Sequence, residues 1–282
     1  MITKLKHYAK RASVYGLVAG FVFFSAAPFA IMLINTFKQD RDLYRPQNNP
    51  FIYNFPPTLD NLKLLFLKTN YVGFLKNSLF VGVMVVIITL IIAIPAAYSL
   101  ARLSGKWGEQ AGIGIFLVYL VPPSLLFIPL FRVVSALGLR NNLWSLVLVY
   151  PSITIPFSTW LLMGFFKSIP RDLEEAAMVD GFSRLMAFIR VVMPLSLSGV
   201  IAVIVFSFTL TLHEFIYALV FISASAQRTI SVGVPVELIR GDVFFWQSLL
   251  AAAVIVALPV GFVYNLFLDR LVAGFTMGAV KG

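Results

Sequence analysis

Acidic residues gather in one polar segment, Ser168 to Gly181, between two long apolar stretches. Two carboxylates among apolar neighbours could act as a general acid and base. No His, metal-ligand cluster or enclosing cleft is evident beside them, so catalysis is the least favoured interpretation. Two interpretations stay open: a turn that merely connects two helices, and a surface on which another protein docks.

The segment has the signals of a short helix. Asp172 is expected to cap its start, with Glu175 reaching back in a variant of the capping box. Gly181 follows the predicted end, where a left-handed conformation is needed. Helical spacing places three small or apolar residues on one face: Leu173, Ala176 and Ala177. Such a face allows another surface to approach closely.

A second candidate region is His213-Glu214-Phe215, within an apolar stretch. An acid inside a membrane span costs about 2.5–3.5 kcal/mol on insertion scales, so it usually faces a protein interior. Glu214 could accept a solute hydroxyl or form part of a gate, which makes the three residues a candidate translocation path. It could equally be a buried acid paired with His213, a Ser/Thr hydroxyl or a partner subunit.

The composition narrows the class of protein. The chain has no Cys and 2 His, which excludes disulfides and thiolate sites and disfavours a histidine-rich metal site. Of its 282 residues 60% are hydrophobic and 12% charged, whereas soluble domains carry about 25% charged residues. The net charge of +10 is therefore ascribed to basic residues flanking membrane segments, and no nucleic-acid partner is expected.

Apolar stretches long enough to cross a bilayer, about 20 residues each, predict an all-α transmembrane protein. Six such stretches occur: 14–34, 78–100, 113–133, 143–165, 195–222 and 248–268. The first is expected to remain uncleaved, because its apolar run exceeds the 7–15 residues usual for a signal peptide. Basic residues before it place both termini in the cytoplasm. Residues 36–76, rich in Pro, are expected to form an external loop with a short helix beginning near Thr58.

Residues of the polar segment at fixed separations resemble the EAA loop of permease subunits of bacterial ABC importers. The matching residues are Glu175, Ala176, Ala177, Gly181, Val191, Met193 and Pro194. Ile and Leu are usual in the family where Val191 and Met193 stand, and both departures keep apolarity and volume.

Further segments look like the sugar-importer branch, and the closest similarity is to the second permease of maltose-type and glycerol-phosphate-type importers. These segments are Phe74–Ser78, Ala96–Arg102, Leu137–Asn142 and Gly274–Gly282. One departure occurs at Leu212-His213-Glu214-Phe215, where the branch commonly has Trp-Asn-Glu-Phe. His213 in place of Asn leaves the substrate open at this site.

The resemblance implies a six-helix type I permease, one domain over 1–282 with its core at 70–270 and a cytoplasmic coupling loop at 168–194. The residues expected to couple the chain to an ATPase are Glu175, Ala176, Ala177, Gly181 and Pro194. The expected partners are a second homologous permease, an ATPase dimer, an extracytoplasmic substrate-binding protein and membrane lipid. The location implied is the inner membrane of a prokaryote.

The sequence lacks a Gly-x-x-x-x-Gly-Lys-Ser/Thr loop, so ATP and Mg are expected on the partner ATPase and no cofactor on this chain. The transported solute implied is a sugar or oligosaccharide, with polyols, glycerol or glycerol phosphate as alternatives. A secondary transporter working without ATP is the rival class. Such proteins often show internal repeats, and none is evident here.

Overall fold

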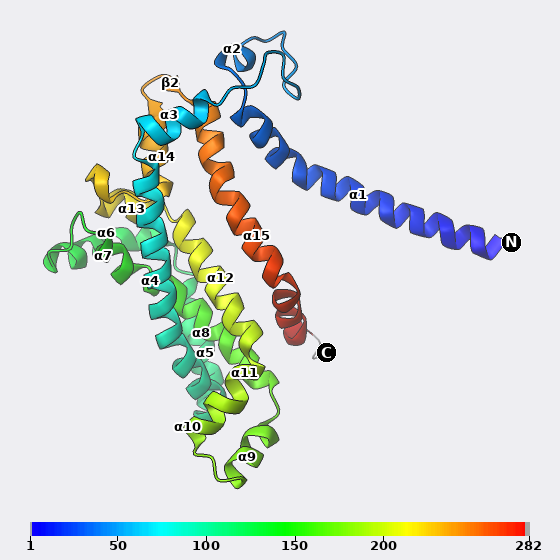
Figure 1. Ribbon diagram of the computed structural model, residues 1–282. Helices are drawn as coiled ribbons and strands as arrows, with labels where there is room; N and C mark the ends of the chain where they lie inside the picture. Colours follow the sequence, from blue (N-terminus) through cyan, green and yellow to red (C-terminus); the bar gives the residue numbers. More distant parts are fainter. Residues whose placement is uncertain (1, 280–282) are drawn as a thin grey trace. The chain divides into compact units, whose positions relative to one another are not determined.

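The computed structural model describes the backbone of residues 2–279 and the side chains of residues 11–268, and helices dominate it (Figure 1). Four helical segments are long and apolar enough to cross a membrane, at Arg11–Thr36, Tyr71–Leu103, Leu143–Ser168 and Trp246–Leu268. These correspond to the first, second, fourth and sixth predicted spans. An unbroken run of apolar residues satisfies its backbone hydrogen bonds only as a helix, which is why these spans were readable from sequence.

The first half of the chain contains α1 (Ile2–Thr36), α2 (Asp40–Leu43), α3 (Asp60–Lys68), α4 (Tyr71–Tyr98), the π-helix η1 (Ser99–Leu103), α5 (Gly105–Tyr119) and α6 (Pro123–Ala136). The middle contains α7 (Leu143–Val149), α8 (Pro151–Ser168), α9 (Arg171–Val179), α10 (Arg184–Ala187), the π-helix η2 (Phe188–Val192) and α11 (Met193–Leu195). The last part contains α12 (Leu197–His213), α13 (Ile216–Phe221), the 3-10 helix η3 (Ser225–Gln227), α14 (Ile230–Leu238), strands β1 (Ile239–Arg240) and β2 (Val243–Phe244), and α15 (Trp246–Ala279).

The third and fifth predicted spans are broken, so predicting them as continuous helices was wrong. The third consists of α5 and α6, which meet at 89°. Pro122 lies at the break with φ −59° and ψ 128°, because the following Pro123 disfavours a helical conformation in the residue before it. The fifth bends by 73° between Leu195 and Leu197, and its helix α12 ends at His213, nine residues before the predicted end.

Residues 1–70 and 235–258 form one compact unit. The predicted external loop is folded here around two polar anchors: the buried Lys38 donates to the carbonyls of Asn49 (3.2 Å) and Pro50 (3.0 Å), and the buried Asp42 accepts from Asn54 Nδ2 at 2.7 Å. The predicted short helix is confirmed as α3. Strands β1 and β2 form an antiparallel hairpin that pairs Ile239 with Phe244 and Arg240 with Val243.

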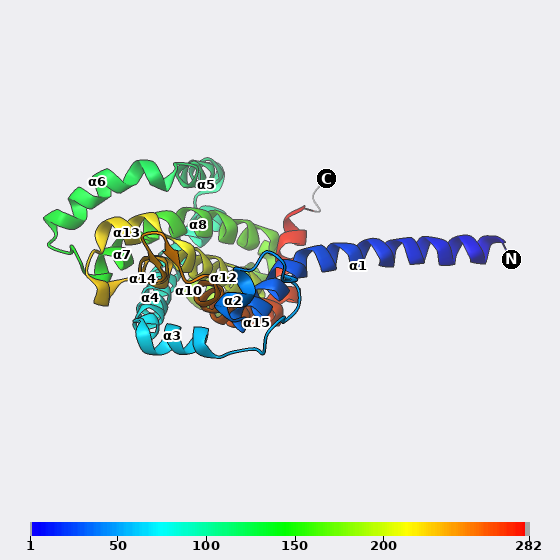
Figure 2. The same cartoon turned by 90° about the horizontal axis from the view of Figure 1, so that it is seen from above.

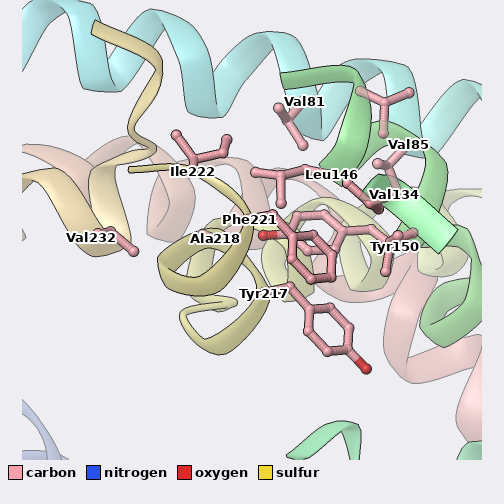
Figure 3. Packing of buried hydrophobic residues seen from close by; sticks show 12 residues of the cluster. Val81, Val85, Val134, Leu146, Tyr150, Tyr217, Ala218, Phe221, Ile222 and Val232 are labelled. Carbon is pink, nitrogen blue, oxygen red and sulfur yellow. The ribbon is translucent and has the colours of Figure 1, made fainter. Parts of the chain in front are cut away.

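Residues 71–234 and 259–282 form the second unit. Within it α8 packs against both α4 and α5, and α12 packs against α4 and α8 (Figure 2). One buried cluster joins α4, α6, α7, α13 and α14, and Figure 3 shows Val81, Leu146 and Phe221 within it beside the rings of Tyr150 and Tyr217. A second cluster, built around Ala97, Leu162 and Val203, joins α4, α8 and α12. The coupling-loop helices α9 and α10 lie at one end of this unit, beyond the ends of α4 and α8 (Figure 1).

Glycine allows two of these helices to approach closely. A Cβ built on Gly199 of α12 would lie 2.6 Å from the ring of Phe165 on α8, well inside van der Waals contact. The phenyl ring therefore occupies the space that any larger residue at 199 would need. This contact fixes α12 against α8 just beyond the coupling loop.

Candidate functional site

The helix α9 is the centre of the predicted coupling loop. It begins at Arg171 directly after Pro170, and no side chain caps it, so the prediction that Asp172 caps its start was wrong. Pro170 stands one residue before the first helical position with a non-helical backbone (φ −56°, ψ 134°), and its ring fixes φ. Asp172 and Glu174 lie in the first turn, where their negative charges interact favourably with the helix dipole.

The end of α9 agrees with the sequence. Gly181 has φ +93°, its N–H donates to Met178 O (3.1 Å), and Phe182 N–H donates to Ala177 O (3.0 Å). This double hydrogen bond with a left-handed glycine is the Schellman motif. Gly181 therefore stops the helix at a defined residue and turns the chain toward α10.

The predicted face of Leu173, Ala176 and Ala177 is divided between the two sides of α9. Ala177 is buried against the protein, whereas Leu173, Glu175 and Ala176 are exposed. Exposed apolar side chains continue along the loop at Val179, Leu185, Met186 and Ile189. Together with Leu173 and Ala176 these form the outer face of the coupling loop. Pro194 is also exposed, in α11 at the 73° bend.

Glu174, which the sequence did not single out, is buried under α9. Tyr98 Oη donates a hydrogen bond to its carboxylate, and Arg102 Nε lies 3.6 Å from the same group. Arg102 Nη2 also donates to Ile169 O at 2.7 Å. Residues three apart on a helix lie on the same face, so Glu174 shares a face with Ala177. This spacing is the one feature of the sequence that could have indicated that Glu174 points inward.

Glu214 lies at the break between α12 and α13, with an extended backbone (ψ 127°). Its carboxylate accepts from Tyr217 N (3.0 Å), Ala218 N (3.2 Å) and Tyr150 Oη (2.8 Å). Two unsatisfied amides at the start of α13 and one tyrosine hydroxyl thus hold a charge that would be costly in an apolar protein. Capturing those amides also explains why the predicted fifth span stops here.

The neighbours of Glu214 in sequence have different surroundings. The ring of His213 contacts Thr209 O through Nδ1 at 2.8 Å and makes no bond to Glu214 among the described side chains. Two of the pairings expected for Glu214 are therefore absent within residues 11–268. Among the side chains described there, its carboxylate is paired neither with His213 nor with a Ser or Thr hydroxyl. Phe215 is exposed at the start of α13.

A cavity of about 520 Å³ lies beside this break. Its lining comes from Tyr119–Pro123 between α5 and α6, Ile153 of α8, and Leu210, His213 and Glu214. Two interrupted helices therefore meet at one hollow, as expected where irregular backbone at membrane depth lines a cavity. Of the predicted path residues, His213 and Glu214 line the cavity and Phe215 does not.

Aromatic rings continue from the cavity along α5, α8 and α12. Tyr119, which lines the cavity, lies 5.4 Å from Phe157, and Phe157 lies 4.2 Å from Phe206, measured between ring centroids. Phe116 stacks on Trp160 at 4.6 Å. Of these rings Tyr119 shares the cavity wall with Glu214, and the others form a partly exposed aromatic row that leads from it.

A bundle of spanning helices with interrupted segments around a cavity, and with a capped helix projecting from one end, defines a membrane permease. Residues 90–276 match the family described as "Binding-protein-dependent transport system inner membrane component". The chain belongs to this family, and it is an inner-membrane permease subunit of an ABC importer with the type I fold.

Named relatives agree over most of the length. The sulfoquinovosyl glycerol transport system permease protein SmoH of Agrobacterium fabrum is 39% identical over 80% of this chain and 79% of its own. The trehalose/maltose transport system permease protein MalG of Thermococcus litoralis is 31% identical over 90% of this chain and 91% of its own. A crystal structure of a bacterial ABC transporter involved in alginate import shares the fold, with a TM-score of 0.76 and 19% identity over 94% of this chain and 96% of the other.

Proposed function

We propose that this permease passes a carbohydrate through the cavity beside Glu214 and receives the energy for transport through α9. The observation that carries the proposal is the outer face of the coupling loop: exposed Leu173, Ala176 and Val179 on a helix that Gly181 ends sharply. A patch of apolar and small residues suits a stable protein contact. The family description supports it, because binding-protein-dependent systems import a solute delivered from outside.

The partners we propose are a second homologous permease, an ATPase dimer and an extracytoplasmic substrate-binding protein. ATP and Mg would be bound by the ATPase, and both termini of this chain would lie in the cytoplasm. Purification of the tagged chain in mild detergent, with mass spectrometry of the co-purifying proteins, tests this assembly. A lone homo-oligomer that transports solute in ATP-free vesicles would contradict it and favour a secondary transporter.

The docking role of α9 is tested by Ala176→Arg. Ala176 is exposed, so a long charged side chain there spares the chain's own packing but blocks a closely approaching partner. In vesicles containing the whole importer we expect solute uptake to fall at least about tenfold, the lower part of the range for coupling between sites. Ala136→Arg, on an exposed helix end of α6, is the matched control and should retain uptake. Equal uptake by both variants would contradict docking at α9.

A carbohydrate is the proposed solute because relatives at 39% and 31% identity are named for a sugar glycoside and for disaccharides. The cavity chemistry supports it: the Glu214 carboxylate accepts hydrogen bonds from hydroxyl groups, and the ring of Tyr119 offers an aromatic face against which a sugar ring can pack. Polyols, glycerol and glycerol phosphate are the alternatives. Uptake of labelled disaccharides, glycerol and glycerol phosphate by the reconstituted importer decides among them, and preference for glycerol phosphate would overturn the carbohydrate proposal.

The path through the cavity is tested by Glu214→Gln. The amide retains one acceptor oxygen for the α13 amides but removes the negative charge facing the cavity. We expect the KM for uptake to rise with the assembly intact, because the solute loses a charge-assisted hydrogen bond worth about 1.5–3 kcal/mol. Unchanged KM and unchanged maximal uptake would remove Glu214 from the path.

A further inference from the structure

A buried polar network connects the inner side of α9 to the end of the spanning helix α4. It consists of Tyr98, Arg102 and Glu174, here called the α4–α9 joint. The side chains of Arg102 and Glu174 are 5% and 8% exposed, so the ion pair is shielded from water. The network lies on the opposite side of α9 from the exposed Ala176, and none of its three residues lines the cavity beside Glu214.

Arg102 holds α9 at two points. Its Nη2 donates to Ile169 O at 2.7 Å, two residues before the helix begins. Its Nε lies 3.6 Å from the carboxylate of Glu174, in the first turn of α9. The hydrogen bond fixes the entry to α9 at one point, and the ion pair, made without a hydrogen bond from Nε, attracts the first turn of α9 to the same guanidinium.

The π-helix η1 places these groups. Tyr98 is the last residue of α4 and Arg102 lies in η1, where Ser104 N–H donates to Ser99 O across five residues (3.0 Å). Wide turns of this kind are rare and occur frequently at functional sites. Here the wide turn accompanies two residues that bind the same carboxylate.

Tyr98 ties the joint to the rest of the helical unit. Its ring centroid lies 4.4 Å from that of Phe188 in η2 and 6.1 Å from that of Phe166 in α8. A displacement of Glu174 would therefore press on α4 through Tyr98 and Arg102, and on α8 and η2 through the packed rings. Close-packed interiors transmit such displacements because they compress little.

We propose that Tyr98, Arg102 and Glu174 are positioning residues for energy coupling, which make α9 and α4 move as one body when an ATPase displaces α9. The proposal rests on the proposed docking of α9. It differs from docking because it concerns the inner face of the helix, which packs against the chain's own helices. Rigid coupling through the joint would give the outer face a mechanical connection to the spanning helices.

The first experiment measures solute imported per ATP hydrolysed by the whole importer in vesicles. Glu174→Gln keeps the shape of the side chain and removes its charge, so we expect ATP hydrolysis to persist while solute per ATP falls about tenfold, within the usual range of coupling energies. The matched control is the double variant Lys167→Met with Glu109→Gln. It breaks an exposed pair (3.7 Å) between α8 and α5 and should leave the ratio unchanged.

The second experiment detects the joint without any partner. The native chain has no Cys, so Val179→Cys, at a position 88% exposed on α9, gives a single site for a spin label. In the full-length chain in lipid nanodiscs, we expect Glu174→Ala to increase the mobility of the label. The Lys167→Met and Glu109→Gln control should leave the spectrum unchanged.

The proposal requires both results: a more mobile α9 and a lower ratio of solute to ATP. Normal solute per ATP in Glu174→Gln, with uptake still lost in Ala176→Arg, would overturn the joint and leave docking in place. Normal uptake in Ala176→Arg would instead overturn docking itself. An unchanged label spectrum in Glu174→Ala would show that the network does not hold α9, and would also overturn the proposal.

Discussion

Two glutamates of this mostly apolar chain are stabilised in contrasting ways. Glu174 and Glu214 each accept a hydrogen bond from a tyrosine, Tyr98 and Tyr150 respectively. Glu174 is additionally paired with Arg102 and closed off from solvent. Within the described side chains Glu214 has no cationic partner; the amides at the start of α13 hold it, and it borders an open cavity.

The difference separates a structural carboxylate from one available to a ligand. A buried ion pair uses both charges on each other, which suits a joint that must not move internally. A carboxylate held by helix amides keeps its negative charge uncompensated by a full positive one. Glu214 therefore has the exposure to the cavity that the proposed solute contact requires, whereas Glu174 is closed off from solvent.

Removing the cation from the first site should have the largest effect. Arg102→Ala leaves Glu174 buried without its charge partner, a change that costs about 3–5 kcal/mol. We expect the lowest thermal midpoint of the whole series, measured in detergent by intrinsic fluorescence. Lys167→Met, at an exposed pair, should barely shift the midpoint. A midpoint for Arg102→Ala equal to that control would show that Glu174 needs no cation.

Removing the second carboxylate should cost less, because it leaves no buried charge unpaired. Glu214→Ala deprives the first turn of α13 of its cap, a loss of about 1–2 kcal/mol. Glu214→Gln should fall between this variant and the native chain. If Glu214→Ala lowered the thermal midpoint as far as Arg102→Ala, a cationic partner for Glu214 would have to exist in the assembly.

Asp42 offers a third carboxylate, outside the spans, for which pH is the test. Burial raises the pKa of its carboxyl. Hydrogen bonds from Asn54 and the charge of Lys38 lower the pKa by more than burial raises it, so the pKa lies below its ordinary value of 3.8. A lowered pKa stabilises the folded state above the unfolded value, and this contribution is lost as the pH falls through the folded one. We expect the thermal midpoint to fall between pH 5 and about pH 3, and Asp42→Asn to weaken that dependence. An equal acid dependence in both proteins would contradict this.

The two tyrosines should show the smallest effects. Tyr98→Phe and Tyr150→Phe each remove one hydrogen bond to a carboxylate, worth about 1.5–3 kcal/mol for a charged acceptor, and the partners that each carboxylate keeps offset part of that loss. Thermal midpoints of the pair compare the two sites directly. Tyr150→Phe should be at least as damaging, because Glu214 has no salt bridge to retain within residues 11–268. The reverse order would show that the ion pair with Arg102 does not compensate for the loss of the Tyr98 hydrogen bond.

The spans could be predicted from sequence because a membrane helix requires a long apolar run, and that run is local. The breaks in the third and fifth spans could not be predicted, because the hydrophobicity of a segment says nothing about the direction of its helix axis. Pro122 and Pro123 were visible, yet proline is tolerated inside membrane helices. The prolines mark a place where the helix can break, but the sequence does not give the angle of 89° between α5 and α6.

In the coupling loop, too, the features set by local sequence could be predicted and those set by distant contacts could not. Gly181 marks the end of α9 through its own backbone requirement, and the structure confirms it. Glu174 acquires its role from Tyr98 and Arg102, more than 70 residues earlier in the chain. Contacts between residues so far apart in the chain cannot be read from the spacing of residues in the loop. The sequence therefore singled out Glu175 and not the buried Glu174. The roles of Glu175, Ala176, Ala177, Gly181 and Pro194 in coupling stay predictions.

The two π-helices constrain how the length of this chain can change during evolution. Each holds one residue more than an α-turn would; η1 follows α4 and carries Arg102, and η2 lies within the coupling loop. Deleting one residue from either would restore an ordinary helix and rotate the downstream residues by about 100°. For η1 that rotation would carry Arg102 away from Glu174. Insertions and deletions should therefore be rare in both turns.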